Sequence, residues 1–145
     1  AFANRVSLAD DLADKEFMAM RELARVPLIN MESAIQHPCQ SLADWKTMDD
    51  LAVPRDGRFV LSWVSHPRAL PLAVPAATVH MAAQRGMDVV VLRPEGYALP
   101  AVVMDKARQA AAAAGGDRQP VPAPIQNEFS HRAAPGPAVT ACSTG

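Results

Sequence analysis

The chain has 145 residues, about the length of one compact domain, and 50% of them are apolar while 20% are charged. This balance is typical of a folded α/β or α-rich protein and argues against global disorder. Fourteen basic and fifteen acidic residues give a net charge of −1 without a Lys/Arg cluster, so we expect no nucleic-acid partner. Proline or charge interrupts the longest apolar runs, so we expect no membrane partner either.

The start of the chain and its cysteines indicate a compartment. The first residues, AFANRVSLADD, carry acid early and contain no apolar signal core, so we expect no secretion. Cys39 and Cys142 lie in unlike contexts and predict neither a disulfide framework nor a zinc site. The sequence therefore predicts a cytoplasmic protein with reduced thiols.

The first third of the chain predicts two helices around a short strand. Ser7, with Asp10 three places later, is a helix-start signal, and this helix must end before Pro27. Residues 27–31 form a short apolar run that predicts a buried strand. Pro38 fits the first position of a second helix, where its missing N–H costs nothing. The apolar stripe expected on that helix is Leu42, Trp45, Met48 and Ala52.

The middle of the chain continues the alternation. Residues 58–64 are β-branched and aromatic, and residues 87–92 form an apolar run, so both predict strands. A helix between them begins near Pro75 and ends at Gly86, and an Ala-rich helix follows over residues 102–114. Strands separated by helices of this length predict the α/β class, with a parallel sheet of βαβ units.

Residues 118–145 have a different composition. They contain five of the thirteen prolines and show no period of 2 or 3.6 residues. Such a segment cannot bury a core. We expect it to be disordered or loosely packed and to supply neither a parallel strand nor an amphipathic helix.

Residues 31–40 are the first candidate for a ligand site, because ligands of open α/β sheets bind beyond the carboxyl ends of strands. His37 and Gln40 lie three residues apart around a helix start, so both side chains can reach one small polar ligand. An imidazole can donate to a carbonyl oxygen and a carboxamide oxygen can accept from an NH₂ group, which fits a carbamoyl group. The alternatives are a helix-capping His37 with a solvated Gln40, an ordinary surface acid at Glu32, and a small buried apolar residue at Cys39.

Two further segments follow predicted strands. His66 and Arg68 could meet an anionic substrate or belong to a proline-stiffened surface loop, and residues 93–97 predict a plain turn. His80 is expected to be packed rather than to bind a ligand, and His131 lies in the last segment. The sequence contains no Gly-rich phosphate loop, no Ser/His/Asp order and no His cluster with metal spacing, so we expect no metal.

Four blocks of the chain resemble one known family. INMESAIQHPCQSLADWKTM contains the His-Pro-x-Gln motif of the carbamoyltransferases at His37, Pro38, Cys39 and Gln40. The Met-Glu-Ser-Ala block before the motif and the Ser-Leu-Ala-Asp block after it resemble the branch that acts on N-acylated ornithine. SWVSHPRALPLAVP and RPEGYAL are similar to the same branch. The resemblance covers about residues 1–117 and identifies the chain with the N-acetylornithine and N-succinylornithine carbamoyltransferases.

The resemblance implies a role for each matched position. His37 and Gln40, with the backbone around Pro38 and Cys39, would bind the carbamoyl group of carbamoyl phosphate, and Glu32 would contact the N-acylated ornithine. His37 would be catalytic, donating to the carbonyl oxygen as negative charge develops on it. The implied reaction is attack of the substrate's δ-amine on carbamoyl phosphate, in arginine biosynthesis. It requires no metal or organic cofactor, and members of the family are homotrimers.

The resemblance also implies how the chain is organised. Residues 1–53 would be the end of a carbamoyl-phosphate-binding domain, residues 54–117 the start of an amino-acid-binding domain, and residues 118–145 a non-matching tail. The sequence contains neither the family's phosphate-binding Ser-x-Arg-Thr motif nor its His-Cys-Leu-Pro motif. Ala76 and Ala77 also replace the usual Asn-Ser.

These departures predict a partial or frame-shifted reading of a longer gene, inactive alone. Three alternatives remain open. The chain could be a non-catalytic fold fragment that at most associates with intact subunits. It could be a relative of ordinary ornithine carbamoyltransferase, or a generic small-ligand-binding α/β module.

Overall fold

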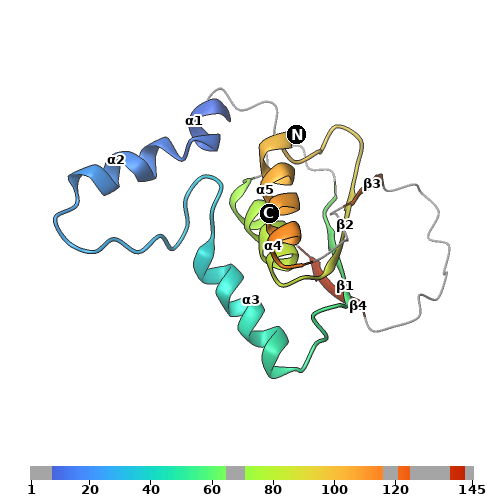
Figure 1. Ribbon diagram of the computed structural model, residues 1–145. Helices are drawn as coiled ribbons and strands as arrows, with labels where there is room; N and C mark the ends of the chain where they lie inside the picture. Colours follow the sequence, from blue (N-terminus) through green and yellow to red (C-terminus); the bar gives the residue numbers. More distant parts are fainter. Residues whose placement is uncertain (1–7, 65–70, 116–120, 125–137, 143–145) are drawn as a thin grey trace.

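The computed structural model describes residues 8–64, 71–115, 121–124 and 138–142. Strands and helices alternate from the first strand to the third, and the predicted α/β class is confirmed. Figure 1 shows α4 and α5 packed together on one side of the strands. The elements are, in chain order, α1 (Leu8–Leu12), α2 (Lys15–Leu23), α3 (Pro38–Asp50), β1 (Arg58–Ser62), α4 (Ala73–Gln84), β2 (Asp88–Arg93), α5 (Ala101–Ala113), β3 (Val121–Pro124) and β4 (Ala138–Cys142).

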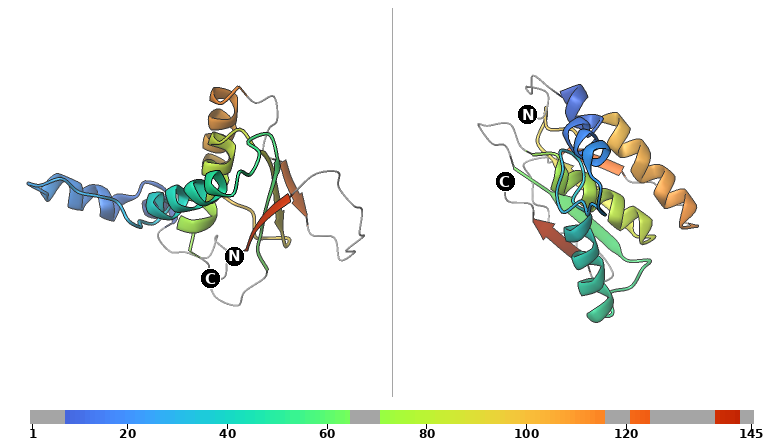
Figure 2. Two further views of the ribbon diagram at one scale, coloured as in Figure 1. Left: turned by 90° about the horizontal axis from the view of Figure 1, so that it is seen from below. Right: turned by 90° about the vertical axis from the view of Figure 1, so that its left-hand side faces the viewer.

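The described strands form one parallel sheet in the order β3-β2-β1-β4. In the central pair Phe59 lies opposite Val89 and Leu61 lies opposite Val91, and all four side chains are buried. Because successive strand residues face opposite sides of a sheet, these four share one face. They pack in one core with Val79 and other side chains of α4 and α5, which cover that face in both views of Figure 2.

The predicted helix ends in this core are confirmed. Gly86 follows α4 with φ of +86° and Gly115 follows α5 with φ of +77°. Glycine adopts this left-handed conformation without the steric cost that a Cβ brings, and so it ends helices readily. The second predicted helix begins at Pro38, as expected. Of its expected apolar stripe, Met48 is buried but Leu42 is exposed, and Ala52 lies beyond the helix end.

The single helix expected before Pro27 is two helices, α1 and α2. The break lies at Asp14, whose φ of 53° is in the left-handed region. The Asp14 carboxylate accepts hydrogen bonds from Ser33 and Ala34, about twenty residues further along the chain. Helical periodicity cannot reveal such a contact, because it reports only on neighbours within the same helix.

The buried strand expected at residues 27–31 is wrong. These residues form no strand, and their large apolar side chains are exposed, with Ile29 at 77%. A strand needs a neighbour for its backbone hydrogen bonds, and the described sheet contains only β1 to β4. We call residues 15–31, which comprise α2 and this segment, the arm. The arm projects away from the sheet in Figures 1 and 2.

The expectation that residues 118–145 add no parallel strand is also wrong. β3 pairs with β2, and β4 pairs with β1. Both are outer strands of the sheet, and an edge position tolerates Pro122 and Pro124 because a missing N–H need not face a partner there. The other residues of this segment lie outside the described ranges. The domain boundary at residue 53 stays a prediction.

In the described part of the chain, no helix is both long enough and apolar enough to cross a membrane.

Candidate functional site

His37 occupies the N-cap position of α3, directly before the first helical residue, Pro38. Its side chain makes no capping hydrogen bond, so the helix-capping alternative is wrong. The backbone N–H groups of Cys39 and Gln40 lie in the first turn, where a helix has no internal acceptor. The partial positive charge of a helix N-terminus favours a partly negative oxygen at this point. The start of α3 therefore combines an imidazole with backbone donors.

Glu32 faces His37 across the loop that precedes α3. Its Oε2 lies 3.8 Å from Nε2 of His37, which is within ion-pair range but too long for a hydrogen bond. The side chain of His37 is 22% exposed and that of Glu32 is 59% exposed, so Glu32 lies at the surface. Nδ1 of His37 is buried and has no partner among the described residues. A ligand that approaches His37 from solvent would therefore bind at Nε2 and not at the buried Nδ1.

The two remaining side chains of the motif contact their immediate surroundings. Gln40 donates from Nε2 to Oδ1 of Asp44 at 2.7 Å, one helical turn further on, which leaves its Oε1 as an acceptor. The Sγ of Cys39 lies 3.7 Å from the carbonyl oxygen of Asn30. Cys39 is exposed, so the expectation of a buried cysteine is wrong. Its position in the first turn of α3 places it beside the loop and not in the core.

A cavity of about 450 Å³ lies between the α1–α2 region and residues 32–34 of the loop that precedes α3. Glu32, Ser33 and Ala34 form one wall. The surplus of carboxylates on its lining favours a cationic group. Its charged residues are Asp10, Asp11, Asp14, Lys15, Glu16 and Glu32.

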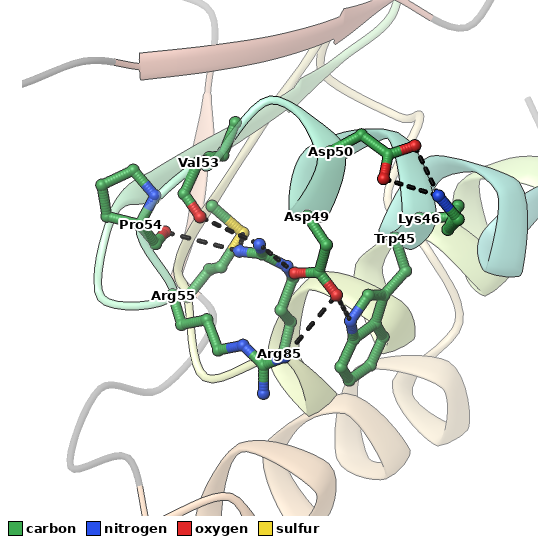
Figure 3. A network of polar contacts seen from close by, with 9 residues as sticks. Trp45, Lys46, Asp49, Asp50, Val53, Pro54, Arg55 and Arg85 are labelled. Carbon is green, nitrogen blue, oxygen red and sulfur yellow. Dashed lines mark hydrogen bonds and ion pairs between the residues drawn. The ribbon is translucent and has the colours of Figure 1, made fainter.

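A second polar cluster holds the opposite end of α3 and is drawn in Figure 3. Arg85 follows α4, and its side chain is only 1% exposed. Its Nη2 donates to Oδ1 of Asp49 at 2.7 Å and to the carbonyl oxygen of Val53 at 2.9 Å. Trp45 donates to the other carboxylate oxygen of Asp49 at 3.0 Å, and Arg55 lies 3.6 Å from it. Arg85 thus ties the end of α3 to α4.

These contacts also determine the ionisation of Asp49. The hydrogen bond from Arg85 is the largest influence and lowers the pKa of the Asp49 carboxyl from its usual value. The positive charge of Arg55 and the Trp45 indole act in the same direction. The carboxylate therefore stays charged under conditions in which an isolated aspartate begins to protonate.

The other candidate segments take no part in this site. His66, Arg68 and His131 lie outside the described residues. The plain turn expected at residues 93–97 is present directly after β2, closed by a hydrogen bond from the Tyr97 N–H to the Pro94 carbonyl at 3.2 Å.

His80 lies half-buried on α4, as expected for a packed histidine. Its burial, and then the charge of Lys106, lower its pKa. Within the described ranges, no group of three His, Cys, Asp or Glu side chains gathers where a metal ion could be held.

Asp14 and Arg85 are two structurally important residues that were not predicted from the sequence. For Asp14 a signal was available, because an aspartate directly before Lys15 and Glu16 fits the N-cap of a separate helix. For Arg85 no signal existed, since its partners at positions 49 and 53 lie more than thirty residues away.

Comparison with known proteins identifies relatives of the whole arrangement. No protein-family model matches the chain. It is 37% identical over 123 residues to the N-acetylornithine carbamoyltransferase of Xanthomonas campestris, which covers 82% of this chain and 36% of the relative. It is 38% identical over 73 residues to the N-succinylornithine carbamoyltransferase of Bacteroides thetaiotaomicron, which covers 50% of this chain and 23% of the relative.

A solved structure agrees with the sequence comparison. A mutant N-acetyl-L-ornithine transcarbamylase, complexed with carbamyl phosphate and N-succinyl-L-norvaline, superimposes with a TM-score of 0.71 at 33% identity. The match covers 83% of this chain and 36% of that one. The chain thus spans about a third of the length of the Xanthomonas campestris enzyme and of this solved structure. It is homologous to part of the N-acetylornithine and N-succinylornithine carbamoyltransferases, the family that the His-Pro-x-Gln block resembles.

Proposed function

We propose that this chain forms the carbamoyl-binding part of an N-acylornithine carbamoyltransferase. The reaction would transfer a carbamoyl group from carbamoyl phosphate to the δ-amine of N-acetyl- or N-succinyl-L-ornithine. The products would be the N-acylcitrulline and phosphate, in cytoplasmic arginine biosynthesis. The observation that carries this proposal is the Glu32–His37 pair at the start of α3, with 3.8 Å between carboxylate and imidazole. A homologous protein binds carbamyl phosphate together with an N-acylated amino acid.

The start of α3 would hold the carbamoyl end of the donor. The His37 Nε2–H would donate to the carbonyl oxygen, which gains negative charge as the amine attacks, so the interaction strengthens toward the transition state. The N–H groups of Cys39 and Gln40 would approach the same oxygen, while Pro38 has no N–H to offer. Oε1 of Gln40 would accept from the carbamoyl NH₂, because the bond to Asp44 already uses its amide nitrogen.

Glu32 would recognise the amine substrate. At neutral pH the δ-amine of an N-acylornithine is a cation, and the carboxylates around the cavity beside Glu32 favour a cation. The ammonium must lose one proton before it attacks, and the C–N bond forms as the bond between the carbamoyl carbon and the phosphate oxygen breaks. Phosphate leaves with the electron pair of that bond. The attacking nitrogen then loses a second proton, which the departing phosphate takes up.

Transfer also requires groups that bind the leaving phosphate. The 145-residue sequence contains no Ser-x-Arg-Thr motif, and each charge-assisted contact to an anion contributes about 1.5–3 kcal/mol. Without several such contacts, the rate of carbamoyl transfer falls by many orders of magnitude. We therefore expect the 145-residue chain to bind carbamoyl phosphate weakly and to show no turnover alone. We also propose that the whole enzyme to which this chain belongs is a homotrimer, as the resemblance implies.

Binding of carbamoyl phosphate tests the proposal directly. In a ¹H–¹⁵N NMR titration we expect the amide signals of Cys39 and Gln40 to shift, with a Kd on the order of 1 mM. His37→Ala should weaken binding by about tenfold, the loss expected for one hydrogen bond of about 1.4 kcal/mol. Thr47→Ala is the matched control, because within the described part of the chain the Thr47 hydroxyl bonds only to the Ala43 carbonyl on the same helix. Equal affinity in both variants would contradict the assignment of His37.

A colorimetric citrulline assay with N-acetyl-L-ornithine and carbamoyl phosphate tests the second half of the proposal. We expect no turnover above the uncatalysed background from the purified chain. Turnover that disappears in His37→Ala would show that this sequence transfers carbamoyl groups without the phosphate-binding motif.

A non-catalytic role is the second candidate function, and the exposed apolar side chains of the arm support it. Leu23, Val26 and Ile29 are exposed on the arm, and exposed apolar clusters often mark association surfaces. In this alternative the chain only associates with intact subunits of its family. Light scattering of the chain mixed with the homologous Xanthomonas campestris enzyme tests this alternative. A complex heavier than either protein alone is expected, and two separate species would contradict it.

A further inference from the structure

Asp14 occupies an unusual place between α1 and α2. It is the N-cap residue of α2, a position where aspartate ordinarily accepts a hydrogen bond from the first turn. Here the side chain makes no capping bond, and the backbone has a left-handed φ of 53°. A non-glycine residue in this region carries a steric cost. Asp14 therefore gives up a local stabilising contact, in a backbone conformation that aspartate and asparagine adopt more readily than most other non-glycine residues.

The carboxylate of Asp14 instead holds the loop before α3. Oδ2 accepts a hydrogen bond from the Ser33 hydroxyl at 2.7 Å, and Oδ1 accepts one from the Ala34 N–H at 3.0 Å. Asn30 donates from Nδ2 to the same Ser33 hydroxyl at 3.0 Å. The loop closes on itself through the Ser33 N–H, which donates to the Gln36 carbonyl at 2.8 Å. One carboxylate thus binds two successive residues of the loop.

These contacts directly follow Glu32 in the sequence. Glu32 is largely exposed, and among the described residues its side chain pairs only with His37, at 3.8 Å, so its own side chain does little to fix its position. The backbone that carries it is fixed instead by the two bonds to Asp14. We propose that Asp14 is a positioning residue, which holds the Ser33–Ala34 loop so that Glu32 stays opposite His37. The consequence for substrate binding rests on the proposed function.

Three variants separate the roles of the Asp14 carboxylate. Asp14→Gly removes the side chain and tolerates the positive φ, so the fold keeps its backbone geometry. Asp14→Asn removes the charge but keeps one oxygen acceptor and the tolerance for a left-handed backbone. Glu16→Gln is the charge control, because Glu16 lies on α2 in the lining of the same cavity and makes no hydrogen bond or ion pair to the described residues of the loop. A positioning role predicts that only Asp14→Gly releases the loop.

The first readout needs no ligand. Amide hydrogen exchange of Ala34 and its neighbours should accelerate by about tenfold or more in Asp14→Gly, because two charge-assisted bonds are lost. Exchange in Asp14→Asn should stay within about threefold of the parent chain, and Glu16→Gln should match the parent. Unchanged exchange in Asp14→Gly would overturn the proposal. Equal acceleration in Asp14→Asn and Asp14→Gly would also overturn it, because charge alone would then account for the effect.

The second readout is the affinity for N-acetyl-L-ornithine, measured by NMR titration. We expect Asp14→Gly to weaken it by about tenfold, Asp14→Asn to restore most of the loss, and carbamoyl phosphate affinity to change less than threefold. Parent-level affinity for N-acetyl-L-ornithine in Asp14→Gly, despite faster exchange, would overturn the positioning of Glu32. A parent chain that binds no N-acetyl-L-ornithine would instead overturn the proposed function, and the exchange data would then decide whether Asp14 positions the loop.

Discussion

Replacing Arg85 with methionine should destabilise the chain through the junction of α3 and α4. Methionine keeps much of the apolar stem but removes the guanidinium, whose Nη2 donates to the Val53 carbonyl at 2.9 Å. A hydrogen bond from a charged donor contributes about 1.5–3 kcal/mol, so we expect a loss of about 2 kcal/mol. The lost bond to Asp49 adds nothing further to this expected loss of stability, because the Asp49 carboxylate is partly exposed and regains contact with water.

Thermal unfolding followed by circular dichroism measures this loss. For a chain of this length, 1 kcal/mol corresponds to roughly 4 °C in Tm, so Arg85→Met should lower Tm by about 8 °C. Arg58→Met is the matched control: Arg58 also pairs with an aspartate, Asp88, at 3.0 Å, but it is half exposed. An exposed pair contributes less than about 1 kcal/mol. A Tm within about 2 °C of the parent for Arg85→Met, or an equal loss in both variants, would refute the reasoning.

Three other substitutions test single features of the structure. Glu32→Gln should weaken N-acetyl-L-ornithine binding while leaving carbamoyl phosphate binding within about threefold in the same NMR titrations, because Glu32 is assigned to the amine substrate alone. His80 has a pKa lowered below 6.5 in the folded chain, so the unfolded chain binds more protons there and stability should fall as pH drops below about 6.5. His80→Gln should flatten that slope in urea titrations at pH 5 and pH 7, and an unchanged slope would contradict it. Ala52 has a φ of 52°, so Ala52→Gly should raise stability by about 0.5–1 kcal/mol in the same titrations, and a lower stability would count against strain at this position.

Local patterns in the sequence determined most of the regular elements. Pro38 at the start of α3 and Gly86 after α4 work through their own backbone preferences, which act wherever the chain places them. The apolar runs of β1 and β2 reflect burial on one face of a sheet, and the alternation of strand and helix implied parallel pairing. The resemblance to the acylornithine carbamoyltransferases could be read from four matching blocks, His-Pro-x-Gln among them, because each block is a local run of residues as well.

Tertiary contacts decided what those patterns could not. The break at Asp14 exists because its carboxylate reaches Ser33 and Ala34, and the apolar residues 27–31 are exposed because no described strand pairs with them. β3 and β4 form in a proline-rich segment because the open edges of β2 and β1 accept them. The place of Glu32 opposite His37 likewise depends on bonds that cross about twenty residues. Hydrophobic period and turn propensity report on neighbours along the chain, whereas each of these features depends on a partner that only the folded chain brings near.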